Sequence, residues 1–241
     1  MNIKQEILNT PLPIHGNKYG VIPHSLFIDT VQEKLYNKGY EIIDENYYAN
    51  KNCNVISGRF QISSNQDLDI TPSIFFENSY DKTKSASLMI GGVVLICKNG
   101  MLGNIVRYKR KHLGNAFTDF LSTLEEGILQ IENEFEKLVV VKDEMKNIEV
   151  NKSTVHKLIA DMYLEEGLIK ETQLAILKRE LKQSENFKGN SLWDLYNNIT
   201  ESFKSNNSKE YTSQHSKFHG YISDNFNLSY KPNLYNSLIL N

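Results

Sequence analysis

The longest apolar run of the chain lies near its middle, from Ser87 to Cys97, and polar residues bound it on both sides. The run is rich in β-branched residues and is followed by the turn signal Asn99-Gly100, so it predicts a buried strand. The segment from Thr71 to Glu77 has the same character. Because the connection between the two segments is short and polar, the pattern predicts a β-hairpin.

Two more strands and a helix are predicted upstream of this hairpin. The segments 40–48 and 54–63 read as strands joined by a polar turn, and the second alternates between apolar and polar residues. An apolar stripe at helical spacing from Ile28 to Leu35 predicts one helix before them. We therefore expect an α+β fold, in which residues 1–115 form a mostly antiparallel sheet of about four strands crossed by one helix. A helical C-terminal region follows.

That helical region opens with the cleanest periodicity of the chain. Its apolar residues step by four and three positions in alternation, which is the a/d seam of three heptads. The members of the seam are Phe117, Leu121, Leu124, Ile128, Ile131, Phe135 and Leu138. The seam packs inside the same chain or pairs between subunits, so a homo-oligomer through the 117–138 helix is one of its two interpretations.

Two shorter helices are predicted after the seam, one from Ser153 and one from Glu171, with Gly167 between them. Two helices around a glycine turn form either a helix-turn-helix or a plain helical hairpin. In the first case the side chains facing DNA would be Lys178, Arg179 and Lys182. The polar residues 205–215 predict a linker. The expected parts are a sheet domain over 1–115, a helical region over 116–204, and a linker with a docking tail over 205–241.

Composition and charge restrict the function classes. The formal net charge of −2 at pH 7 excludes attraction of the whole protein to nucleic acid and leaves only local patches. Two cysteines, Cys53 and Cys97, do not make a disulfide framework, and they predict a reducing cytoplasm. No apolar run reaches the ~18 residues of a membrane span and no signal peptide is visible, so we expect no membrane partner.

The densest basic cluster follows the predicted hairpin. Its members are Arg107, Tyr108, Lys109, Arg110, Lys111 and His112. Cationic side chains neutralise phosphates, and an interleaved aromatic ring stacks on a base. The cluster therefore predicts a contact with nucleic acid, to which Arg59 would add a phosphate contact and Tyr80 a second stacking ring. A solvated basic loop without a partner is the alternative.

Motifs of catalysis and of cofactor binding are absent from the sequence. There is no phosphate-binding glycine loop, no dinucleotide fingerprint, no zinc-protease helix and no nucleophile elbow. Asp67 and Asp69 would suit a divalent metal on a strand, but their polar neighbours favour a solvated turn. His215 and His219 lack a third ligand. We expect no cofactor and no metal, and no enzyme unless distant residues assemble a site.

The segment NSYDKTKSASLMIGGVVLICKNGML, followed by YKRKHLGN, resembles the phage- and plasmid-borne family catalogued as Domain of Unknown Function 932. The family pattern has Asn-Ser-His-Asp-Gly, a hydrophobic strand, Arg-Val-Val-Cys-x-Asn-Thr-Leu and a basic segment with His-Thr-Gly. A later element, Trp-x-x-x-Asn-x-x-Thr-Glu, resembles SLWDLYNNITE. The matching residues are Asn78, Ser79, Asp81, Cys97, Asn99, His112, Gly114, Trp193, Asn197, Thr200 and Glu201.

The resemblance spans roughly residues 20–205, and two departures from the pattern stand out. Tyr80 replaces the histidine of the first motif, and Gly100-Met101 replaces Thr-Leu. If that histidine performs chemistry in the family, this chain lacks it. The resemblance implies a mobile-element protein in the cytoplasm of a bacterial host, and it implies no activity.

Three functions follow as hypotheses. The first is a nucleic-acid-binding accessory protein of a phage or plasmid, which binds single strands and promotes annealing in replication or recombination. The second is a host-directed protein that binds a bacterial protein, without nucleic acid, through the seam and the aromatic tail. The third is an enzyme of unknown reaction, whose site would be built from Asn78, Ser79, Asp81, Asn99 and His112.

Overall fold

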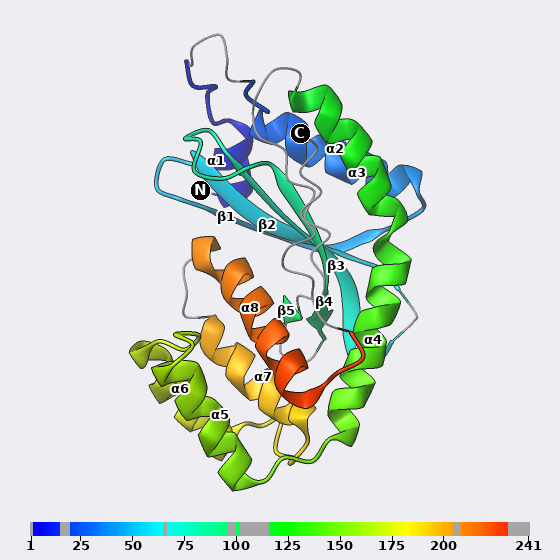
Figure 1. Cartoon of the computed structure of the whole chain (residues 1–241). Coiled ribbons are helices and arrows are strands. Elements are labelled where there is room, and N and C mark those ends of the chain that lie inside the picture. The colour runs from blue at the N-terminus through cyan, green and yellow to red at the C-terminus, as the bar shows by residue number, and fades with distance from the viewer. Residues whose placement is uncertain are drawn as a thin grey trace.

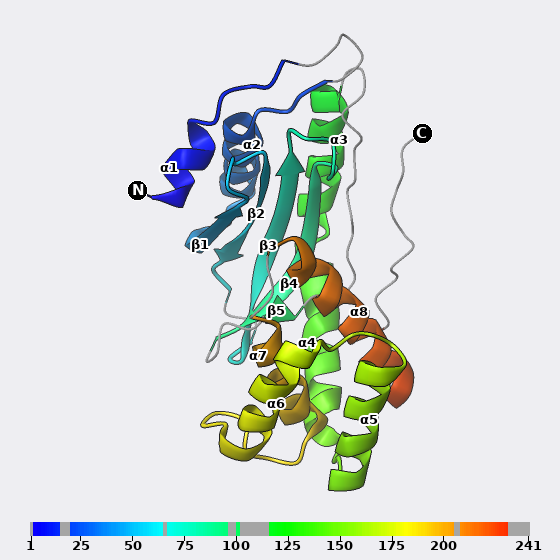
Figure 2. The same cartoon turned by 90° about the vertical axis from the view of Figure 1, so that its left-hand side faces the viewer.

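The computed structural model describes residues 2–14, 20–64, 67–95, 100–101, 116–204 and 208–230. For residues 116–120, 122, 123 and 208–212 it describes the backbone alone. A five-stranded sheet with α1, α2 and α3 forms one end of an elongated molecule, and helices α5 to α8 form the other end (Figures 1 and 2). The fold is α+β, as predicted.

The sheet is antiparallel throughout, in the order β1-β2-β3-β4-β5. Its strands are β1 (Ile42–Ala49), β2 (Val55–Ile62), β3 (Ile70–Ser79), β4 (Ser87–Val94) and β5 (Gly100–Met101). The predicted hairpin is formed by β3 and β4, whose residues are all buried. Burial on both faces explains why these two strands read as continuous apolar runs in the sequence.

Eight helices lie in the described part of the chain. They are α1 (Ile3–Leu8), α2 (His24–Asn37), α3 (Ala116–Leu129), α4 (Ile131–Asn147), α5 (Lys152–Leu164), α6 (Glu171–Gln183), α7 (Leu192–Phe203) and α8 (Ser208–Phe226). The helices predicted near Ile28, Ser153 and Glu171 are α2, α5 and α6. None of the helices in the described residues is long and apolar enough to cross a membrane.

The first part of helix α8, residues 208–215, lies where the polar composition predicted a linker, and its later part lies where a docking tail was expected. Phe218 and Ile222 lie on one face of this helix, together with His215 and His219, and all four side chains are completely buried. The helix was missed because histidine counts as polar in a hydrophobic pattern, whereas these two imidazoles serve as core residues.

Helices α3 and α4 connect two hydrophobic cores. The sheet core lies between the sheet and α2 and is centred on Phe27, Phe60 and Phe76. The helical core lies among α4 to α8 and is centred on Trp193 and Tyr196. Only Gln130 separates α3 from α4, and its backbone dihedrals remain helical. The two helices therefore follow one another in nearly the same direction, α3 along the sheet and α4 along the helical half of the molecule (Figure 2).

The heptad seam contributes side chains to both cores. Leu124, Ile128 and Ile131 belong to the sheet core, whereas Phe135 and Leu138 belong to the helical core. These five side chains are at most 4% exposed. This part of the seam is thus buried within its own chain, so these five residues are not free to pair between subunits.

A buried ion pair joins the loop before β3 to α4. Lys142 is 3% exposed and bonds the Asp67 carboxylate, and its ammonium also lies 3.2 Å from Asp69. Lys146 reaches Asp69 at 2.6 Å. Burial alone would raise the pKa of Asp67 and Asp69, but hydrogen bonds from the lysines outweigh it and hold both below their usual values. The two carboxylates considered for a metal therefore bind ammonium groups.

We predict that Lys142→Met lowers the free energy of unfolding by about 3–5 kcal/mol, because it leaves a buried carboxylate without its cation. The matched control is Lys146→Met, whose side chain is 40% exposed. This control should lower the free energy of unfolding by about 1 kcal/mol or less. Urea unfolding at pH 7 measures both, and equal small losses would contradict a buried pair.

The two histidines of α8 are buried in their neutral form. The hydroxyl of Tyr196 lies 3.2 Å from Nδ1 of His219, and the His215 ring packs edge-on against Phe203. Burial lowers the pKa of His215 to about 3 and that of His219 to about 4. The unfolded chain protonates both near pH ~6.5. Acid therefore favours the unfolded state from pH ~6.5 downwards.

We predict that stability falls between pH 7 and pH 5, because only the unfolded state takes up these protons. Each histidine contributes up to about 1.4 kcal/mol per pH unit below its unfolded pKa. Urea midpoints at pH 7, 6 and 5 measure the slope. His215→Gln/His219→Gln should flatten it, and the exposed His156→Gln should keep it. The same slope in the double variant would show that other groups cause it.

Candidate functional site

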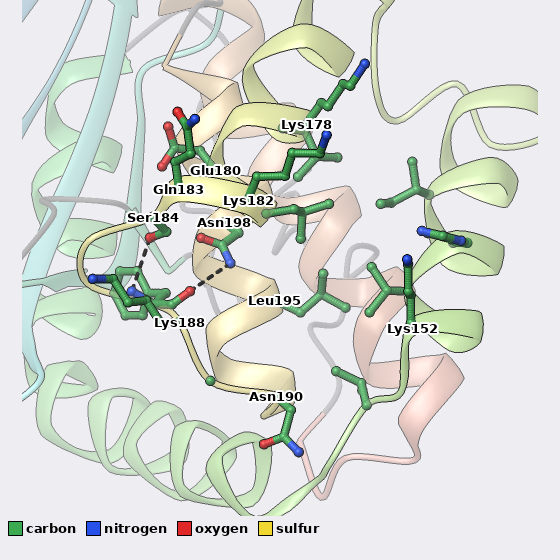
Figure 3. A pocket seen from close by; sticks show the side chains of 18 of the residues that line it. Lys152, Lys178, Glu180, Lys182, Gln183, Ser184, Lys188, Asn190, Leu195 and Asn198 are labelled. Carbon is green, nitrogen blue, oxygen red and sulfur yellow. Dashed lines mark hydrogen bonds between the residues drawn. The ribbon is translucent and has the colours of Figure 1, made fainter.

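A groove with a volume of about 1040 Å³ opens among α5, α6 and the first half of α7 (Figure 3). Its floor is apolar, because α6 turns Leu174, Leu177 and Leu181 towards it at helical spacing, and Leu195 of α7 joins them. The loop between α6 and α7 adds Phe187, whose backbone N–H donates to Ser184 Oγ at 3.1 Å.

Four lysines line this groove. They are Lys152 at the start of α5, Lys178 and Lys182 on α6, and Lys188 in the loop before α7. None of them makes an ion pair with any residue in the described part of the chain. The single carboxylate of the lining is Glu180, which pairs with Arg179 at 2.8 Å. The groove is therefore cationic, although the chain as a whole is slightly acidic.

The sequence had singled out Lys178, Arg179 and Lys182 as cations that would face DNA from a helix-turn-helix. Helices α5 and α6 do meet around Gly167, which has a φ of +58°. However, Lys178 and Lys182 line the groove between these helices, and Arg179 turns to Glu180. Lys152 and Lys188 were missed, because they are distant in sequence and join the set only through folding.

A smaller pocket of about 330 Å³ adjoins the groove, between the end of α6 and α7. The two share the residues Glu180, Gln183, Ser184, Phe187 and Asn198. The wall of the smaller pocket also includes Asn197 and Glu201. Asn197 Nδ2 donates to the Trp193 carbonyl at 2.9 Å, and the Trp193 ring is buried in the helical core.

The motif at the end of β3 fixes the backbone around it. Asn78 Nδ2 donates to the Ile22 carbonyl at 2.9 Å and lies 3.0 Å from Nδ1 of His24. The Ser79 hydroxyl donates to the Lys84 carbonyl at 2.8 Å and accepts from the Lys84 N–H at 3.0 Å. Asn78 thus holds the segment before α2, and Ser79 closes the β3–β4 hairpin.

Asp81 has a similar local role in the hairpin loop. Its carboxylate accepts hydrogen bonds from the Thr83 backbone N–H, at 3.0 Å, and from the Thr83 hydroxyl. The hydrogen bonds of Asn78, Ser79 and Asp81 thus lead to different partners, and each residue has a structural role in the segment around it. Asn99 and His112 of the predicted catalytic centre lie outside the described residues.

Tyr80 is part of a buried network. It is 2% exposed, and its ring stacks on that of His24 with centroids 3.7 Å apart. Its hydroxyl accepts from the His24 backbone N–H at 2.8 Å, and His24 Nε2 lies 2.9 Å from the Cys53 carbonyl. Burial raises the pKa of Tyr80. The stacking of a base predicted for Tyr80 does not fit this position.

The other predicted contacts divide into two groups. Arg59 lies on β2 with its side chain 11% exposed, and its guanidinium is 3.6 Å from the Asp44 carboxylate on β1. Its charge is therefore partly neutralised within the sheet. The remaining contacts lie outside the part that the structure describes, as does the motif residue Cys97; they are Arg107, Tyr108, Lys109, Arg110, Lys111 and His112.

The family model of the domain of unknown function DUF932 matches residues 11–220. The chain belongs to this DUF932 family. The match takes in both motifs, the groove and most of α8. Comparison with curated proteins and with solved structures found no match.

Lys82 has a backbone conformation that bears on one position of the pattern described above. The pattern has glycine where this chain has Lys82, and Lys82 adopts a left-handed backbone with a φ of +65°. Glycine accepts that conformation without a steric penalty, whereas other residues pay about 1–2 kcal/mol. A glycine at this position of the turn would therefore be free of the strain that Lys82 bears.

We predict that Lys82→Gly stabilises the protein by about 0.5–1 kcal/mol, because relief of the left-handed strain exceeds the flexibility that glycine adds to the unfolded chain. Thermal or urea unfolding measures the change. Lys51→Gly, at an exposed turn position whose own φ is not positive, is the control and should destabilise by a similar amount. A loss of stability in both variants would show that Lys82 is not strained.

Proposed function

We propose that this DUF932 protein is a mobile-element accessory factor that binds nucleic acid, and that the lysine groove of α5, α6 and α7 is its contact surface. The observation that carries the proposal is the set of four lysines without ion-pair partners among the described residues, which surrounds an apolar floor. Lysine ammonium groups neutralise phosphates, and apolar side chains receive the faces of bases.

The geometry favours a single strand over a duplex. The apolar floor lies between helices and is lined by Leu174, Leu181 and Phe187. In a duplex the bases are stacked inside the helix, and only the phosphates would meet the lysines. In a single strand the base faces are free to lie on the floor while the phosphates stay at the rim. Annealing or protection of single strands is the role that this arrangement supports.

We predict that Lys178→Gln/Lys182→Gln weakens binding of a labelled single-stranded oligonucleotide. If each lysine contacts one phosphate, the slope of log K against log salt should become shallower by about 1.4, and affinity near 0.1 M salt should fall on the order of tenfold. Fluorescence anisotropy at several salt concentrations measures both quantities. The control Lys51→Gln/Lys217→Gln removes the same charge at exposed positions outside the groove and should change little.

A second variant tests whether nucleic acid binds outside the groove. Lys109→Gln/Arg110→Gln/Lys111→Gln removes the basic cluster predicted from the sequence. If this variant alone loses binding, the protein binds nucleic acid but not in the groove. If the unaltered protein shows no binding even at low salt, the proposed function is wrong.

A further inference from the structure

The smaller pocket beside the groove is rich in hydrogen-bond acceptors. Glu180, Glu185 and Glu201 contribute carboxylates to its wall. Its one lysine, Lys204, lies 2.7 Å from the carboxylate of Glu201. A phosphate would be repelled from this pocket, whereas a group that donates hydrogen bonds would be accepted.

Asn198 points to the same kind of ligand by an independent observation. It is 5% exposed and lines both the pocket and the groove. Its Nδ2 donates to the Phe187 carbonyl at 3.1 Å, which fixes the orientation of the amide (Figure 3). Its Oδ1 is buried and has no hydrogen-bond partner. A buried acceptor without a donor is unfavourable, so a ligand that supplies one gains affinity.

A metal ion does not account for these acceptors. Nowhere in the described part of the chain do three His, Cys, Asp or Glu side chains gather closely enough to hold one. An amino group needs fewer partners than a metal ion does, because each of its N–H bonds takes a single acceptor.

We infer that this pocket holds one unpaired base of a single strand through the exocyclic amino group of that base. The inference rests on the proposed function, since the strand must lie in the lysine groove for its base to enter. Asn198 Oδ1 accepts from one N–H bond of the amino group, the other N–H bond points towards the carboxylates of the wall, and Phe187 at the junction contacts the base. Adenine and cytosine present such an amino donor, whereas thymine presents a carbonyl at the corresponding position.

The test compares labelled dC15 and dT15 by fluorescence anisotropy with the full chain. We expect dC15 to bind about fivefold to tenfold more tightly, which is the effect of one added hydrogen bond. Asn198→Leu should remove this preference. The matched control is Asn133→Leu, an exposed amide outside the pocket and the groove, which should keep it.

A change in the ligand avoids any folding defect of the Asn198 variant. Oligonucleotides with N4,N4-dimethylcytosine lack the amino donor and should bind the unaltered protein as dT15 does. Equal, salt-sensitive binding of dC15 and dT15 would overturn the pocket assignment and leave the proposed function standing. A preference that survives dimethylation or Asn198→Leu would place the contact elsewhere. No binding of either strand would remove the proposed function itself.

A protein partner with a cationic side chain is the competing occupant. A labelled tri-arginine peptide tests it under the same conditions. Peptide binding that Asn198→Leu abolishes, together with no preference between dC15 and dT15, would assign the pocket to a peptide cation and overturn the inference.

Discussion

One apolar stripe along α3 and α4 holds the molecule together. Its first half is buried against the sheet and α2, and its second half against α7 and the sheet end. Because the two helices continue almost without a break, burying one half fixes the direction of the other. The ion pair between Lys142 and Asp67 adds a polar attachment along α4. The groove owes its position to this arrangement, since α7 packs on α4 and on α6.

The sequence was most informative where burial is either continuous along a strand or periodic along a helix. The hairpin of β3 and β4 was predicted because both of its faces are apolar, and the stripe of α3 and α4 because its spacing persists for three heptads. α8 was missed for the opposite reason. His215 and His219 behave as neutral core residues, and no pattern of hydrophobicity reveals which histidines a fold will bury.

The site was predictable only in fragments. Lys178 and Lys182 could be recognised because they are one helical turn apart on the same helix. Lys152 and Lys188 join them through the packing of α5 and of a loop, which local sequence does not encode. Asn198 was hidden next to the motif residue Asn197, and only the hydrogen bonds distinguish them. The Asn197 amide donates back to its own helix, whereas Asn198 leaves an acceptor unpaired.

The first DUF932 motif shows what a recurring pattern can mean. Asn78, Ser79 and Asp81 all bond to backbone or to neighbouring loop residues, and Lys82 occupies a position of positive φ. Such residues preserve the shape of a hairpin, and they place no demand on what the protein binds. A match to this motif is therefore evidence about the shape of the hairpin and not about the ligand. What this chain binds has to be established by experiments on the chain itself.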